Sequence, residues 1–373
     1  MRSFGRRKRA SIDENFKEYV MQEIGKSGVE VLDEEGVESI AVDSIEGFAD
    51  LMGKRVASLA LRDKRTLRAN QKMDYGFNRR LERRYRRAFQ AYIVATSCAR
   101  EAGESAAAIP ADDLTDPQAA TRTALMGLHA KSCRVAGEVY ALLVNGFPEG
   151  ALARCRTLHE MAVVAGALAD SVGDSENEDL AIRFLEHEVV DLRSSARRYQ
   201  EDHAILGMEP LEQEFIDQVE DRFNAVMAKY GREFKGDYGW AKKYCPDANL
   251  AGLEKKVQMG HMRGYYKWAN NEVHAGSRSL LLNVSEFRGQ RMLRAGKTNV
   301  GLTDPASMAL NSLFVVTVML LAEGIPESVN LTGLVTMKAL NEMCAQASEM
   351  FLRVDREIME DEENILRSMN LGN

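Results

Sequence analysis

The feature that most constrains this chain is a helical spacing of apolar residues that recurs over most of its length. In one clear example the apolar side chains fall three or four residues apart, on one face of a helix with 3.6 residues per turn. These residues are Phe77, Leu81, Tyr85, Ala88 and Tyr92. Runs of β-branched residues are scarce, and helix formers such as Ala, Leu and Glu are abundant. The sequence therefore predicts an all-α protein built as a multi-helix bundle.

The length of the chain indicates how many domains it forms. The chain has 373 residues, whereas single cores usually stop growing at roughly 250 to 300 residues. We expect a main α-helical bundle domain over residues 66–373 and a small N-terminal helical appendage over residues 1–65. In the appendage, a helix capped by Ser11 is expected to precede a short hairpin or extended linker at residues 28–43, with another helix from Ser44.

Residues that typically begin or end helices indicate where the helices of the main domain lie. Asp-Pro pairs at 116–117 and 304–305 have the order that begins a helix, and the sequence NGFP at 145–148 is a tight turn. Residues 149–170 are Ala-rich and apolar on most faces, so they are expected to form the central helix. The polar stretch 283–303 predicts a loop or short hairpin. Other helices are expected at about 116–144, 176–200, 211–230, 250–275, 304–324 and 332–366.

Composition and motifs argue against several classes of protein. The five cysteines are widely spaced, which suits reduced thiols and a cytoplasmic location. The longest apolar run, residues 312–325, is shorter than the roughly 20 residues of a membrane span, so we expect a buried core helix and no membrane partner. Walker A, G-x-G-x-x-G, H-E-x-x-H and Glu-x-x-His patterns are missing. The sequence thus predicts no cofactor and no bound metal.

Charge is spread unevenly along the chain. Residues 62–87 carry eleven Lys and Arg against three acidic residues, whereas residues 355–363 are acidic. Because apolar residues claim the other side of this helix, we expect its arginines to project into solvent or onto a partner. The face is either simply solvated or contacts RNA or an acidic protein. The candidate nucleic-acid-binding residues on it are Arg79, Arg83, Arg84 and Arg87.

Two segments carry most of the candidate chemistry. On the apolar central helix, Arg156 and Glu160 share a face and His159 lies beside them. Buried charges need partners, so these residues form either an internal ion pair that orients neighbouring helices or a ligand-binding face. In the second segment, Asn271 and His274 share a helical face, unless His274 simply caps a helix end. We expect Arg156, Glu160 and His274 to approach one another within the bundle.

The two segments together resemble a known family. The central helix reads A-L-A-R-x-R-x-L-x-E and the later segment reads N-E-V-H-A-G-S, which is similar to an uncharacterised bacterial family of helical proteins, a domain of unknown function. The resemblance covers about residues 75–350. More distantly, that family resembles the HEPN superfamily of helical nucleases and nucleotide-binding proteins, whose hallmark is Arg, four to six residues, then His. Arg154 and His159 have that spacing.

The resemblance implies a metal-independent ribonuclease that acts as a homodimer, such as a toxin-type effector in bacterial defence against phage. His274 or His159 would be the general acid and base, and Arg156 would clamp the phosphate. Glu160 would hold Arg156, and Asn271 would be an orienting amide. The residues implied to contact unpaired bases or the RNA backbone are Tyr265, Tyr266, Trp268 and Arg278.

A second hypothesis fits the same residues. The protein would be a non-catalytic helical adaptor or sensor that binds nucleic acid or a partner protein through the basic helix. The internal charges of the central helix would then be purely structural. Convergence of His274 and Arg156 in one open cleft would favour the enzyme.

Overall fold

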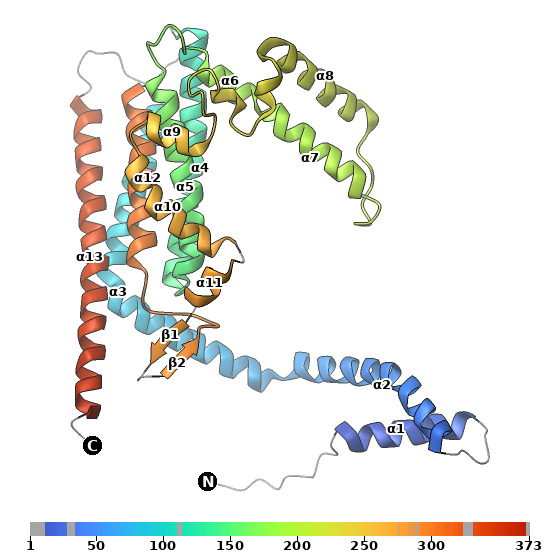
Figure 1. Ribbon diagram of the computed structural model, residues 1–373. Helices are drawn as coiled ribbons and strands as arrows, with labels where there is room; N and C mark the ends of the chain where they lie inside the picture. The colour runs from blue at the N-terminus through green and yellow to red at the C-terminus, as the bar shows by residue number, and fades with distance from the viewer. Residues whose placement is uncertain are drawn as a thin grey trace. The chain divides into compact units, whose positions relative to one another are not determined.

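The structure is a computed structural model, and its regular elements are almost all helical (Figure 1). Within the part of the chain that it describes, the strands form one antiparallel hairpin, in which Val284 pairs with Leu293 and Phe287 with Gln290. The all-α prediction and the hairpin predicted in residues 283–303 are confirmed. The strands are β1 (Val284–Phe287) and β2 (Gln290–Leu293). The described residues are 12–27, 34–109, 114–274, 276–282, 284–287, 290–323 and 331–370.

The chain divides into two compact units, residues 1–77 and 78–373, and the division falls inside the long helix α3 (Lys64–Ala107). The first unit contains α1 (Ile12–Ser27) and α2 (Glu34–Arg62). These two helices pack through aromatic rings, because the ring of Phe48 lies 5.1 Å from that of Phe16 and 5.5 Å from that of Tyr19.

The extended linker predicted at residues 28–43 is wrong where the structure describes it, since α2 begins at Glu34. Glu34 and Glu35 lie in the first turn of this helix, where negative charge interacts favourably with the helix dipole. That local preference outweighs a short alternation of apolar and polar residues. The predicted capping residue Ser11 and residues 28–33 lie outside the described residues.

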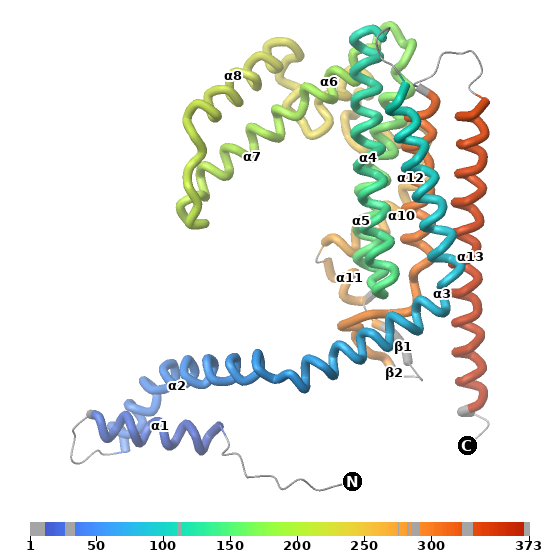
Figure 2. Tube along the Cα trace, turned by 180° about the vertical axis from the view of Figure 1, so that it is seen from behind, coloured from blue at the N-terminus to red at the C-terminus, as the bar shows by residue number. Residues whose placement is uncertain are grey.

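The second unit is a bundle around a central helix. Its main helices, with α3, are α4 (Asp116–Val144), α5 (Pro148–Asp170), α12 (Thr303–Glu323) and α13 (Leu331–Asn370). α5 packs against α4 and α12, and α12 packs in turn against α4 and α13 (Figures 1 and 2). α3 joins them through Tyr92, whose hydroxyl donates to the carbonyl oxygen of Ala136 on α4 at 2.9 Å. The bounds predicted for α4, α5, α12 and α13 are confirmed to within a few residues.

α12 is the helix that carries the longest apolar run. Of the helices in the described residues, it is the one long and apolar enough to cross a membrane, from Thr303 to Ala322. More than half of that stretch is buried inside the protein, and Leu310 and Val316 are fully enclosed. The core helix predicted at residues 312–325 is therefore confirmed as far as Glu323, and residues 324 and 325 lie outside the described residues.

Shorter helices decorate the bundle. They are α6 (Leu180–Glu186), α7 (Glu188–Asp202), α8 (Gln213–Tyr230), α9 (Leu250–Lys256), α10 (Arg263–Ala269) and α11 (Ser277–Leu282). The 3-10 turns between them are η1 (Arg232–Lys235), η2 (Gly239–Ala241), η3 (Gly260–Met262) and η4 (Asn270–Glu272). α7 and α8 form a helical hairpin, in which Glu220 of α8 binds Arg193 and Arg197 of α7 at 2.8 Å each.

Two predicted helices are divided in the structure. The helix predicted over residues 176–200 is split at His187, whose Nε2 lies 2.9 Å from the carbonyl oxygen of Gly236. The helix predicted over residues 250–275 is wrong as a single element, because α9 ends at Lys256 and α10 begins at Arg263. Between them Gln258 has a φ of 58°, in the left-handed region that a continuous helix cannot contain. This break turns α10 so that it packs against α5.

Asp355 on α13 ties three helices of the bundle together. Its Oδ1 accepts a hydrogen bond from the hydroxyl of Tyr85 on α3 at 2.8 Å, and its Oδ2 accepts one from the hydroxyl of Thr303 on α12 at 2.6 Å. Burial and this carboxylate raise the pKa of Tyr85 far above its usual value, so the phenol keeps the proton that it donates.

Replacing this carboxylate should destabilise the bundle. Asp355→Ala leaves the partly buried hydroxyl of Thr303 without this acceptor and leaves that of Tyr85 with only the carbonyl oxygen of Asn299 at 3.0 Å, so we expect a loss of about 1–3 kcal/mol in the free energy of unfolding. Urea denaturation followed by circular dichroism measures it. The control is Glu357→Ala, an exposed residue on the same helix, which should change stability by less than about 0.5 kcal/mol. Equal stability of the two variants would contradict the role given to Asp355.

Candidate functional site

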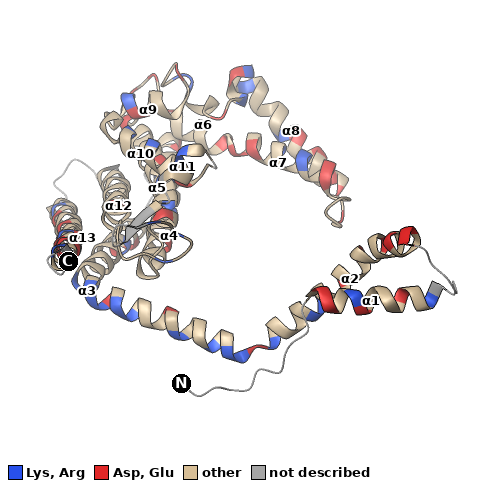
Figure 3. Ribbon diagram, turned by 60° about the horizontal axis from the view of Figure 1, so that its bottom comes forward, with Lys and Arg blue, Asp and Glu red and all other residues tan. Residues whose placement is uncertain are grey.

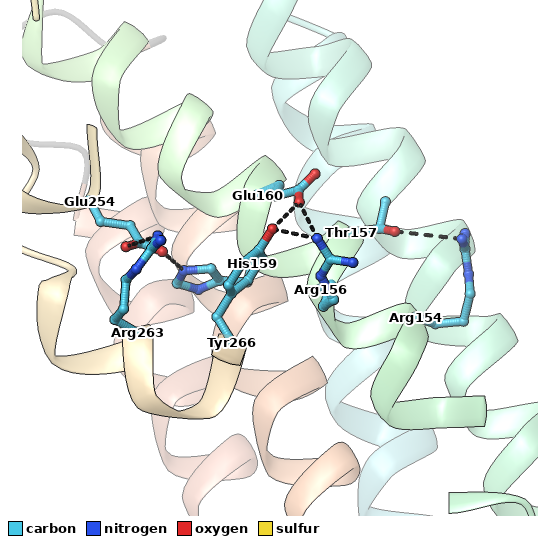
Figure 4. Close-up of polar contacts among 8 residues, drawn as sticks. All are labelled: Arg154, Arg156, Thr157, His159, Glu160, Glu254, Arg263 and Tyr266. Atoms are coloured by element: carbon cyan, nitrogen blue, oxygen red, sulfur yellow. Dashed lines mark hydrogen bonds and ion pairs between the residues drawn. The ribbon is translucent and has the colours of Figure 1, made fainter. Parts of the chain in front are cut away.

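The ionisable residues of α5 emerge from an otherwise apolar helix. Cys155, Leu158, Ala162 and their neighbours are fully buried, so Arg156, His159 and Glu160 must find partners on adjacent elements. Those partners come from α9 and α10, which pack along this side of α5 (Figures 1 and 4).

Arg156 and Glu160 meet a tyrosine of α10. The Nη2 group of Arg156 donates to the hydroxyl oxygen of Tyr266 at 2.6 Å, and that hydroxyl donates to Oε1 of Glu160 at 2.7 Å. Arg156 and Glu160 also form a direct ion pair at 3.6 Å. The guanidinium lies over the Tyr266 ring, 4.8 Å from its centroid. The predicted Arg156–Glu160 pair is therefore present, with the phenol of Tyr266 bridging it (Figure 4).

His159 lies deeper and has different partners. Its Nε2 is 2.8 Å from Oε1 of Glu254 on α9, and both side chains are only 1% exposed. The other oxygen of Glu254 accepts a hydrogen bond from Arg263, also at 2.8 Å. This buried carboxylate is thus satisfied from two sides, which removes most of the penalty for placing a charge in the interior.

The tyrosines around Glu160 are held in their neutral form. Burial raises the pKa of Tyr266, and the bond to Glu160 acts in the same direction while Arg156 opposes it. Burial, followed by the charge of Glu160, raises the pKa of Tyr238 to about 12. Both phenols therefore remain proton donors at neutral pH, and Glu160 has a donor in place.

The structure places the remaining residues of the second segment on the surface. His274 is exposed, and its side chain forms no hydrogen bond or ion pair with the described residues, so it is not joined to Arg156 or Glu160. Trp268 and Arg278 are exposed as well. Asn271 donates to the carbonyl oxygen of Trp268 at 2.9 Å, a local bond near the end of α10. The residue of this segment that contacts Arg156 and Glu160 is therefore Tyr266, whereas His274 was expected.

Two of the predicted site residues, Tyr266 and His159, are largely enclosed in the structure. Tyr266 was expected to offer a stacking surface to bases, but it is 7% exposed and bonded on both sides of its hydroxyl. His159 was a candidate acid and base, but it is enclosed with Glu254. The Arg154 side chain, which completes the hallmark spacing with His159, points elsewhere and binds Glu138 of α4 at 2.7 Å. The Arg-x4-His spacing therefore does not unite the two side chains.

Sequence reasoning missed Glu254 and Arg263. One signal was present, since Leu250, Leu253 and Val257 form an apolar helical stripe and Glu254 falls within it. A charge on an apolar stripe indicates a buried ion pair. Its partner Arg263 follows after the break in the helix, which the sequence pattern did not reveal.

A second candidate surface lies on α3. Lys and Arg positions recur along α3 (Figure 3). Arg79, Arg83, Arg86 and Arg87 are exposed, whereas Leu81 and Tyr85 are buried, and we call these four arginines the arginine stripe. All four are exposed and form no ion pair with the described residues. Arg84 differs, because it binds Asp361 of α13 at 2.6 Å. The predicted exposure of the basic helix is confirmed, and the acidic end of α13 neutralises one of its arginines.

The described residues contain no group of three or more His, Cys, Asp and Glu side chains arranged to hold a metal ion. All five cysteines are free thiols. Burial raises the pKa of Cys133 to about 11 and thereby keeps this thiol protonated, although it lies 3.8 Å from a ring nitrogen of His129.

Comparison with known proteins adds one finding. Residues 122–291 match a family described as a family of unknown function (DUF5677). The match begins in α4 and ends in the β hairpin, so it includes α5, α9 and α10 and leaves α3 outside. No curated protein and no solved structure matches the chain. The expected likeness to an uncharacterised family is thus supported for this part of the chain.

The buried position of His159 predicts a structural role. His159→Ala removes one partner of a buried carboxylate and leaves a cavity, so we expect a loss of about 3–5 kcal/mol in unfolding free energy. Arg154→Ala is the control, since it removes the other half of the Arg-x4-His pattern from a half-exposed pair and should cost about 1 kcal/mol or less. Urea denaturation separates the two. Similar losses in both variants would contradict this assignment.

Proposed function

We propose that the protein binds single-stranded RNA through the arginine stripe of α3 and acts as a non-catalytic adaptor or sensor. The observation that carries the proposal is the exposure of four arginines on one helical face without an acidic partner among the described residues. Guanidinium groups bind phosphate oxygens in a bidentate fashion, and a stripe of them attracts a polyanion. The proposal places the protein in the cytoplasm, where its free thiols and RNA would both be found.

The internal charges support a non-catalytic role. Arg156, His159 and Glu160 of α5 have specific partners on α9 and α10, so they stabilise the packing of these helices, although the buried Nε of Arg156 makes no hydrogen bond with the described residues. The arginines of α3 are in the opposite situation. Every residue of the stripe keeps its charge open to solvent, at the cost of mutual repulsion along the helix. A bound phosphate chain would relieve that repulsion.

Removing the stripe should weaken RNA binding in a salt-dependent way. In the triple variant Arg79→Ala, Arg83→Ala, Arg87→Ala we expect affinity for a labelled single-stranded RNA to fall about tenfold or more at low salt. The slope of log K against log salt should decrease by about 2, because each lost phosphate contact contributes about 0.7 on a single strand. Fluorescence anisotropy over a salt series measures both quantities.

A matched control removes the same charge from another surface. Arg198, Arg222 and Arg232 are exposed residues of α7, α8 and η1, and their triple alanine variant should retain wild-type affinity and slope. If the control loses as much affinity as the stripe variant, binding depends on total charge alone and the assignment to α3 fails. If the wild type binds no RNA at low salt, the proposed function fails.

A second candidate is a HEPN-like, metal-independent ribonuclease, and one observation favours it. Arg156 and Glu160 are joined to α10, the helix that leads to the exposed His274, inside the region that matches the family. In this proposal His274 exchanges protons with the 2′-hydroxyl or the leaving oxygen, and Arg156 stabilises the phosphorane. Such a site requires His274 to reach Arg156, for example from a second protomer of a homodimer.

The ribonuclease candidate is tested by two single variants. His274→Ala and Arg156→Ala should each abolish cleavage of single-stranded RNA if this site is catalytic, with folding verified by thermal melting. The adaptor proposal predicts that the wild type leaves the same RNA uncut under conditions in which it binds it. Cleavage by the wild type that is lost in both folded variants would replace the adaptor with the nuclease.

A further inference from the structure

A polar groove runs beside the arginine stripe, between α3 and α4. Its volume is about 580 Å³, within the roughly 300 to 1,000 Å³ typical of small-molecule sites. Arg86 belongs to both the stripe and the groove. From α3 the lining residues are Asn78, Glu82, Arg86, Phe89, Gln90 and Ile93, and from α4 they are Tyr140 and Val144, with Asn145 directly after the helix.

One part of the groove is aromatic. The ring of Tyr140 packs edge-on against Phe89 with centroids 5.9 Å apart, and it stacks on Tyr92 at 5.7 Å. Burial raises the pKa of Tyr140, and the nearby charge of Glu82 acts in the same direction. The ring is therefore a neutral, fixed platform that remains partly exposed. Such rings stack on unpaired bases.

The other part of the groove carries groups that recognise hydrogen-bond donors and acceptors. The side-chain amide of Asn78 donates to Oδ1 of Asn145 at 3.0 Å, and Lys297 donates to the Asn78 oxygen at 3.1 Å, which fixes this end. Glu82 and Gln90 are exposed and form no hydrogen bond or ion pair with the described residues. A carboxylate and an amide thus line the groove with their bonding capacity unused.

We infer that this groove binds a guanine base of the RNA whose backbone lies on the arginine stripe, an inference that rests on the proposed function. The Watson–Crick edge of guanine presents two neighbouring N–H donors, which suit the two oxygens of Glu82. Adenine lacks this pair of donors. The base stacks against the exposed part of Tyr140, and Arg86 binds the adjoining phosphate. The stripe supplies affinity for any sequence, and the groove supplies a preference for one base.

The test compares three RNA ten-mers by fluorescence anisotropy: one of uridine alone, one with a single central guanosine and one with a single central adenosine. The wild type should bind the guanosine oligomer about tenfold more tightly than the adenosine oligomer. Glu82→Gln should remove that preference, because its amide presents one acceptor in place of two. Affinity for the uridine oligomer and its salt dependence should not fall in this variant.

The matched control is Glu178→Gln, which makes the same change at an exposed position in the connection between α5 and α6. It should keep the full preference for guanosine. Equal binding of the guanosine and adenosine oligomers by the wild type, or an unchanged preference in Glu82→Gln, overturns the inference.

Guanosine 5′-monophosphate separates two proposals: that the arginine stripe binds RNA, and that the groove binds guanine. If the wild type binds no oligomer, calorimetric titration with this nucleotide follows. Binding that Glu82→Gln removes and Glu178→Gln retains upholds the groove and refutes RNA binding by the stripe. The absence of binding to both RNA and nucleotide overturns the groove together with the proposed function.

Discussion

The burial of α5 is the constraint on which the rest of the second unit depends. This helix is apolar on most of its faces, yet it carries Arg156, His159 and Glu160. His159 is enclosed and Arg156 and Glu160 are half-buried, so the surrounding elements must supply hydrogen bonds and opposite charges to offset their loss of water. The break after α9 serves this need, because it lets Glu254 reach His159 and lets Tyr266 reach Arg156 and Glu160 from successive short helices. The position of α10 is thus set by electrostatics as well as by apolar packing.

Charged residues on α5 and on α3 differ in whether they have partners within the protein. On α5, Arg156, His159 and Glu160 each have a partner, and the network is closed around His159, although the buried Nε of Arg156 makes no hydrogen bond with the described residues. The four arginines of the stripe on α3 face solvent and form no ion pair with the described residues, whereas Arg84 of the same helix binds Asp361. Satisfied charges orient helices, whereas unsatisfied charges remain available to a polyanion. This contrast favours recognition by the surface of α3 over chemistry at α5.

Much of the fold follows from the sequence, because helical periodicity and Asp-Pro or Asn-Gly punctuation are local signals. The bounds of α4, α5 and α12 and the exposed side of α3 could be predicted in this way. The break between α9 and α10 could not be predicted. It depends on the left-handed backbone conformation of Gln258, a residue type that does not indicate such a conformation. For the site, the need of Arg156 for a partner was predictable from burial. The partner was not, because Tyr266 and His274 lie in one segment and only tertiary packing decides between them.

We propose that RNA contacts α3 and the α3–α4 groove and does not enter the polar cluster of α5. Photochemical cross-linking of 4-thiouridine-substituted RNA to the full chain, followed by mass spectrometry of the peptides, tests this claim most directly. Cross-linked peptides should come from residues 78–93 and 140–145, and their yield should fall as salt increases. Cross-links concentrated on residues 265–278, with those on α3 missing, would contradict the claim and place the RNA beside His274.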